Sequence, residues 1–95
     1  MTATSKPVAL VTGGNRGIGF AIAQGLIAKD YKVMITARSL TSAEQAAEKL
    51  AGTVVPIALD ISQDDSIEQA VATIRQRSDR LDVLINNAGV YPDEG

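Results

Sequence analysis

Residues 12–19 have the types and the spacing that bind a phosphate group through the backbone. They read TGGNRGIG and join a short apolar run to a segment with helical periodicity. At such a junction one glycine lets the chain turn off a strand, a second lets backbone amides approach a pyrophosphate, and a third lets the helix pack closely. The amino end of the helix then offers free N–H groups and the positive end of its dipole. A plain tight turn also uses glycine, but the strand-loop-helix setting favours a phosphate site.

The residues after the next apolar run distinguish between nucleotides. Ala37 and Arg38 stand where an acid would hold the ribose 2′-hydroxyl of NAD, and no acid follows before Glu44. An arginine pairs with a 2′-phosphate, which an acid would repel. Arg16 in the loop is a second candidate for the same phosphate, and a solvated surface charge is the alternative for either arginine. We therefore expect NADP(H) as the cofactor.

Other chemistries lack their residues in this sequence. The 95 residues contain no Cys and no His, which excludes disulfides, thiolate ligands, Cys nucleophiles and His bases. Asp64 and Asp65 form the acidic pair that we expect to share a face, where complementing a helix dipole is favoured over binding a metal. The loop does not end in Gly-Lys-Ser/Thr, which disfavours nucleoside triphosphate hydrolysis.

The bulk properties predict a cytoplasmic protein without nucleic-acid or membrane partners. The net charge is −2, so the chain has no general attraction to nucleic acids or anionic membranes. The first six residues are short and polar, unlike a secretory signal, and the apolar runs are far shorter than a membrane span.

Apolar runs alternate with helical patterns, and together they predict the elements that position the loop. We expect strands over residues 8–11, 32–36, 54–59 and 81–85, and a first helix over residues 18–28. A second helix has N-cap candidates in Thr41 and Ser42 and a C-terminal glycine in Gly52, and Ser62 is the expected N-cap of a third. The expected buried faces are Ile18, Phe20, Ile22, Ala23, Gly25, Leu26 and Ile27 in the first helix, Ala43, Ala46, Ala47 and Leu50 in the second, and Ile67, Ala70, Val71 and Ile74 in the third.

The order β-α-β-α-β-α-β predicts an α/β fold, the first half of a Rossmann-type doubly wound parallel sheet with strand order 3-2-1-4. Pro56 fits this order, because a proline inside a strand belongs at a sheet edge and the third strand is an edge. We expect one truncated NADP(H)-binding domain over residues 1–95, with the fold in 7–91 and tails in 1–6 and 92–95.

Three motifs make residues 7–91 resemble the short-chain dehydrogenase/reductase family. They are the glycine motif of residues 12–19, Leu59-Asp60-Ile61 after the third strand, and Asn86-Asn87-Ala88-Gly89 after the fourth. The run of residues 8–19, together with residues 36–38, looks most like the carbonyl reductase branch, which uses NADPH. The resemblance implies that Asp60 accepts a hydrogen bond from the adenine amine beside Ile61, and that residues 87–89 line the adenosine ribose. Turn and loop roles are the alternative for these residues.

Together, these arguments give one set of candidate cofactor-binding residues. The set comprises Gly13, Asn15, Arg16, Gly17, Ile18, Gly19, Arg38, Asp60, Ile61, Asn87, Ala88 and Gly89.

The family's catalytic Ser, Tyr-x-x-x-Lys and later Asn are not assigned to any residue here. Ile35 stands four residues after Tyr31, and Gly95 four after Tyr91. We therefore predict no catalytic and no metal-binding residue in this sequence. Hydride transfer between NADP(H) and a small carbonyl or alcohol substrate is expected of the complete protein. A non-catalytic NADP-binding module and an inactive relict are the alternatives. The unpaired side of the fourth strand predicts self-association.

Overall fold

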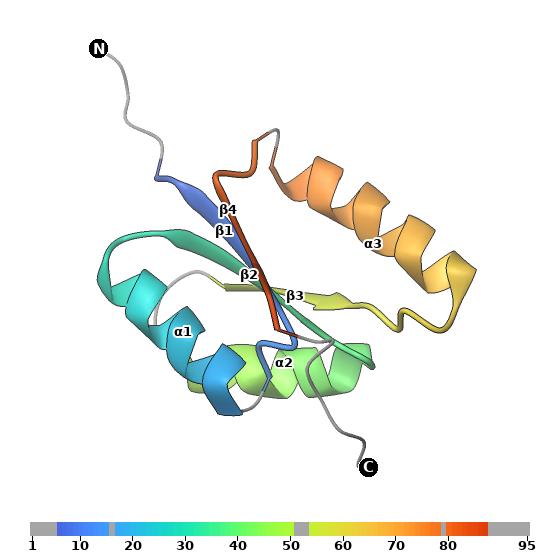
Figure 1. Cartoon of the computed structure of the whole chain (residues 1–95), viewed down its shortest axis with the longest axis horizontal. Helices are drawn as coiled ribbons and strands as arrows, with labels where there is room; N and C mark the ends of the chain where they lie inside the picture. Colours follow the sequence, from blue (N-terminus) through green and yellow to red (C-terminus); the bar gives the residue numbers. More distant parts are fainter. Residues whose placement is uncertain (1–5, 16, 51–53, 79, 88–95) are drawn as a thin grey trace.

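A computed structural model describes residues 6–15, 17–50, 54–78 and 80–87, which form alternating strands and helices (Figure 1). The elements follow in the order β1 (Val8–Thr12), α1 (Gly17–Ala28), β2 (Lys32–Ala37), α2 (Leu40–Lys49), β3 (Val54–Ala58), α3 (Asp64–Arg77) and β4 (Val83–Asn86). This order is the predicted one. The first three strands begin at the predicted residues, because each contains the apolar run from which it was predicted.

The four strands form one sheet in the order β3-β2-β1-β4, with every pair parallel. The predicted fold class and strand order are therefore confirmed. Pro56 lies in the edge strand β3, in register with Ile35 of β2. The position suits proline, because an edge strand has one side on which no ladder hydrogen bond is needed.

Helices cover both faces of the sheet, with α1 and α2 on one face and α3 on the other (Figure 1). Neighbouring residues of β2 divide between the two faces. Ile35 packs in the core with Ala23 of α1 and Ala46 of α2, whereas Met34 packs in the core with Ala70 of α3. Burial on both faces explains why β1 and β2 are continuous apolar runs rather than alternating ones.

Helix α1 buries a narrower face than the sequence predicted. Ala23 is fully buried, and its neighbours Phe20, Ile22, Leu26 and Ile27 pack partly buried against the same core. Ile18 was expected on this face but is 72% exposed, and Gly25 is also exposed. In the first turn Gly19, not Ile18, faces the glycine loop, so Ile18 is turned outward.

Helix α2 confirms its predicted buried face but not its predicted beginning. Ala43, Ala46 and Leu50 are buried. The N-cap, however, is Ser39, whose hydroxyl oxygen accepts a hydrogen bond from the N–H of Ser42 at 3.2 Å. The predicted cap at Thr41 or Ser42 is wrong, because a competent serine lies two residues earlier. Gly52 lies outside the described residues.

Helix α3 begins at Asp64, with Gln63 as an N-cap residue that makes no side-chain capping bond. The predicted cap, Ser62, is wrong. Asp64 and Asp65 do lie in the first turn, where their charges complement the helix dipole. Of the predicted buried face, Ala70 is buried and Ile74 packs against the core, whereas Ile67 and Val71 are 38% and 42% exposed.

Strand β4 begins two residues later than predicted, because Asp82 anchors its start. The N–H of Val8 donates to Asp82 Oδ2 at 2.8 Å, and the N–H of Asp82 donates to the Val8 carbonyl at 2.9 Å. Arg80 forms a two-pronged ion pair with the same carboxylate. Hydrogen bonds from Arg80, then from Val8, hold the pKa of the Asp82 carboxyl below its usual range. Leu81, predicted as the first residue of the strand, lies before this anchor and is 43% exposed.

No described helix combines the length and the apolar character that a bilayer crossing requires.

Candidate functional site

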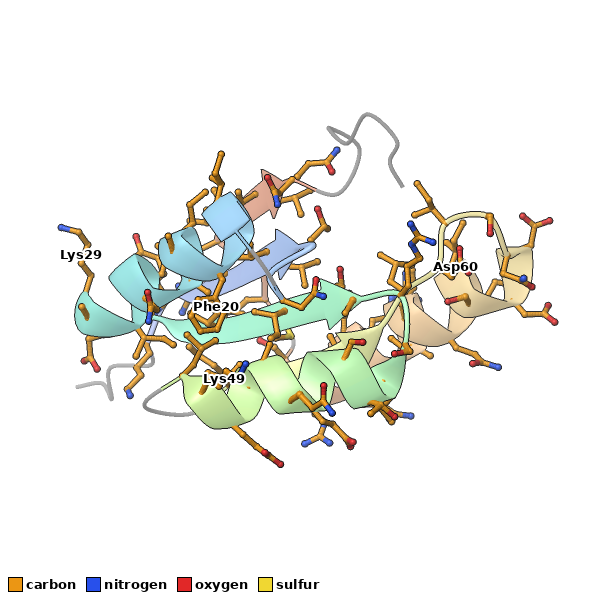
Figure 2. All side chains as sticks on the ribbon, turned by 90° about the horizontal axis from the view of Figure 1, so that it is seen from below. Phe20, Lys29, Lys49 and Asp60 are labelled. Carbon is orange, nitrogen blue, oxygen red and sulfur yellow. The ribbon has the colours of Figure 1, made fainter. Side chains whose placement is uncertain are left out.

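The candidate residues lie where the parallel strands end. All four strands point the same way, so the loops after them meet at one edge of the sheet. The chain leaves β1 for β2 on one side and reaches β4 on the other, which makes the end of β1 a topological switch point, the usual place for a ligand in such sheets. In Figure 2, Asp60 on the loop after β3 lies at the opposite end of the molecule from Lys29, which follows α1.

The glycine loop after β1 gives each of three glycines a different constraint. Gly13 has φ +67°, where the chain turns off the strand. Gly17 has φ +57°, and a Cβ built on it would meet no atom of the described residues within 4 Å, so their packing leaves the backbone open to a ligand there. A Cβ on Gly19 would lie 2.5 Å from the Gly13 carbonyl oxygen, so α1 packs against the loop too closely for a side chain. The turn at Gly13 and the close packing at Gly19 agree with two of the roles expected from the sequence, and the approach to a pyrophosphate stays a prediction.

The amino end of α1 completes the loop. No acidic residue occupies the first turn of this helix, so its free N–H groups and positive dipole end are not neutralised by a side chain of that turn. Ile18 is 72% exposed in the same turn and leaves an apolar surface beside those amides. Arg16 lies outside the described residues.

Hydrogen bonds tie the loop to the strands on either side of β1. Towards β4, the N–H of Asn87 donates to Thr12 Oγ1 at 2.8 Å, and the Asn87 side-chain amide reaches the Gly13 carbonyl at 3.5 Å. Towards β2, the N–H of Gly13 donates to Thr36 Oγ1 and the N–H of Gly14 to the Thr36 carbonyl, each at 3.1 Å. The loop is therefore held in place by its two neighbours before any ligand binds.

The ends of β2 and β3 place a positive and a negative group near each other. Arg38 is exposed directly after β2. Beyond β3, the Asp60 carboxylate accepts hydrogen bonds from the hydroxyl of Ser62 at 2.6 Å and from its N–H at 3.0 Å. The Ser62 hydroxyl, and then its N–H, lower the pKa of the Asp60 carboxyl, and the charge of Arg38 adds a smaller lowering. Asp60 is therefore ionised at neutral pH and can accept a hydrogen bond from an amine.

Most of the predicted cofactor-binding residues lie at this edge of the sheet, and three of them lie outside the described residues. The loop and first helical turn hold Gly13, Asn15, Gly17, Ile18 and Gly19; Arg38 follows β2; Asp60 and Ile61 follow β3; and Asn87 follows β4. Arg16, Ala88 and Gly89 lie outside the described residues.

Residues that support the site without being in the predicted set include Thr36, Ser62 and Gly14. Thr36 acts through a hydrogen bond to Gly13, which lies 23 positions away in the chain. Ser62 acts through a hydrogen bond to Asp60, which depends on the conformation of the turn between them. Gly14 is required by packing, because a Cβ there would lie 2.7 Å from Ile35 Cγ2. Only the double glycine of the loop gave any signal for it in the sequence. The described residues gather no group of three or more side chains that could bind a metal.

Comparison with known proteins points to one family. The model of the short chain dehydrogenase family matches residues 7–95. The short-chain dehydrogenase anuI of Penicillium roqueforti is 42% identical over 95 residues. The match covers 95% of this chain but 38% of that protein, so the chain spans less than two fifths of the length of this relative.

Solved structures agree with this comparison. Menthone neomenthol reductase from Mentha piperita superimposes with a TM-score of 0.81 at 34% identity, over 88% of this chain and 32% of that one. A metagenomic short-chain oxidoreductase in complex with NADP gives a TM-score of 0.77 at 37% identity, over 88% of this chain and 39% of that one.

Proposed function

The chain belongs to the short-chain dehydrogenase family, and from that premise we propose that it binds NADP(H) at the carboxyl edge of its sheet. The observation that carries this proposal is the end of β2. Arg38 is exposed there, and the residue before it is Ala37 rather than an acid that would bind a ribose 2′-hydroxyl. A guanidinium suits a 2′-phosphate because it is always charged and donates several hydrogen bonds in one plane.

The described residues fit the rest of such a cofactor. The open backbone at Gly17 and the first turn of α1 would hold the pyrophosphate. The Asp60 carboxylate, which accepts a hydrogen bond from the Ser62 hydroxyl, would also accept one from the adenine amine beside Ile61. Asn87 would line the adenosine ribose, where the hydrogen bond to Thr12 fixes its backbone.

Within the complete protein, we assign this part of the fold to an oxidoreductase that interconverts a carbonyl and an alcohol, as in the carbonyl reductase branch. The nicotinamide cofactor, when bound, would supply the hydride in the reduction and accept it in the oxidation. A non-catalytic NADP-binding module is the second candidate. Both candidates require the same nucleotide site, and we propose a cytoplasmic location for either.

The test is calorimetric titration of the chain with 2′,5′-ADP and with 5′-AMP, which differ in the 2′-phosphate alone. We expect 2′,5′-ADP to bind more tightly. Arg38→Gln should weaken that ligand by about 1–3 kcal/mol, since a charge-assisted pair is lost, and should leave 5′-AMP nearly unchanged. Arg75→Gln, an equal change of charge in the last turn of α3, is the matched control. Equal affinities of the unmodified chain for the two ligands would contradict the assignment of NADP(H).

A further inference from the structure

The buried polar side chains among the described residues are two threonines, Thr12 and Thr36, at the ends of neighbouring strands. Thr36 is the more deeply buried, with 2% of its surface exposed, and the four other buried residues of β2 are apolar. Burying a hydroxyl among apolar side chains costs free energy unless the hydroxyl is hydrogen-bonded, so the partner of Thr36 indicates what its hydroxyl does.

That partner is the backbone of the glycine loop. Thr36 Oγ1 accepts a hydrogen bond from the buried N–H of Gly13, and the Thr36 carbonyl accepts one from Gly14, each at 3.1 Å. Gly13 is the residue at which the chain turns away from β1, with φ +67°. The regular pairing of β1 with β2 stops before it, at Val11, so a side chain supplies the acceptor that the ladder no longer provides.

The position of Gly13 in turn sets the position of α1. The Gly13 carbonyl oxygen lies 2.5 Å from where a Cβ of Gly19 would be, which shows how tightly the loop and the first helical turn are packed. The Asn87 side-chain amide donates a hydrogen bond to the same carbonyl at 3.5 Å. A shift of the Gly13 peptide would therefore move the amides at the amino end of α1.

Thr36 stands two residues before Arg38 on the same strand end. We propose that the Thr36 hydroxyl is a positioning residue that fixes the amino end of α1 relative to Arg38, and so fixes the spacing of the two phosphate-binding groups. The inference rests on the proposed function, because it assigns the 5′-phosphate side of the cofactor to α1 and the 2′-phosphate to Arg38. It adds a residue that touches neither phosphate.

Three ligands and two variants test this role. NMR titration of the full chain would use 5′-AMP, 2′-AMP and 2′,5′-ADP. Thr36→Val keeps the shape of the side chain but removes the acceptor, so we expect it to weaken the two ligands with a 5′-phosphate by roughly tenfold and 2′-AMP by less than twofold. Thr36→Ser restores the hydroxyl and should recover most of the loss. Amide exchange of Gly13 should become faster in Thr36→Val and return to normal in Thr36→Ser.

Controls separate positioning from general loss of structure. Thr73→Val removes a hydroxyl that bonds within α3, to the Gln69 carbonyl at 2.9 Å, and should change no affinity. An equal loss of all three ligands in Thr36→Val, or unchanged binding of all three, would overturn the positioning role while leaving the proposed function intact. If the unmodified chain bound none of the ligands, the proposed function would be wrong and this inference with it.

Discussion

Two glycines of helix α1 differ in how closely the rest of the protein packs against them. Gly19 of α1 abuts the Gly13 carbonyl. Gly25, six residues further along the same helix, has no atom of the described part of the chain within 4 Å of the point where a Cβ would lie. Both lie in a helix, where alanine is intrinsically preferred over glycine by about 1 kcal/mol. The contact, not the helix, therefore decides which of the two positions requires glycine.

We expect Gly19→Ala and Gly25→Ala to change stability in opposite directions. A Cβ at position 19 would lie 2.5 Å from a backbone oxygen that cannot rotate away, so the variant should lose about 1–3 kcal/mol of unfolding free energy. Gly25→Ala, the matched control, should gain roughly 0.5–1 kcal/mol, because its side chain enters open space. Urea denaturation of both variants measures the difference. A neutral or stabilising Gly19→Ala would show that the loop yields more easily than this packing implies.

At the scale of elements, the sequence predicts strands better than helix ends. Residues 8–11 and 33–35 are apolar because both faces of β1 and β2 are covered, and this signal is local and strong. Residues 39–42, by contrast, contain three hydroxyl side chains that can each cap a helix. The capping-box spacing predicted Thr41 or Ser42, whereas the N-cap is Ser39. The start of β4 depends on the contact between Asp82 and Val8, 74 residues apart, which no local pattern contains.

The same distinction applies to the site. The glycine motif and Arg38 could be proposed from residue type and spacing alone, because the expected chemistry is carried by the residues themselves, and their binding roles stay predictions. Thr36 could not, because its role depends on a hydrogen bond to a residue 23 positions away, across two strands. Ser62 was predicted as a helix cap, and this prediction is wrong because its hydroxyl donates a hydrogen bond to the nearby Asp60 carboxylate instead.

The beginning of α2 can be tested directly. Ser39→Ala removes the hydroxyl oxygen that accepts the Ser42 N–H, so we expect it to lower the free energy of unfolding by about 1 kcal/mol. Thr41→Ala changes an exposed residue inside the helix and should stay within about 0.5 kcal/mol of the unmodified chain. Thermal and urea denaturation compare the two variants. A larger loss of unfolding free energy from Thr41→Ala than from Ser39→Ala would contradict Ser39 as the N-cap and support Thr41.

Across the whole molecule, the two edges of the sheet differ in protection. Strand β3 carries Pro56, which cannot donate to an added strand. Strand β4 pairs with β1 on one side, and no strand of the described part of the chain lies along its other side. Leu84 in its centre is 58% exposed, between the half-buried Val83 and Ile85. Unpaired backbone groups beside apolar side chains form a template for pairing with another strand.

We therefore expect the 95-residue chain to self-associate through β4. Sedimentation velocity at several concentrations should show mass increasing with concentration, and amide exchange at residues 83–86 should slow as the oligomer forms. Leu84→Lys places a charge in the middle of the edge, where it would face its counterpart in a paired copy, and should shift the chain towards monomer and higher solubility. Val71→Lys, which adds the same charge to a 42% exposed position on α3, should leave association unchanged if β4 is responsible. A monomer at every concentration with strongly protected β4 amides would show that this edge is already covered. Equal effects of the two lysines would show that the contact does not depend on β4.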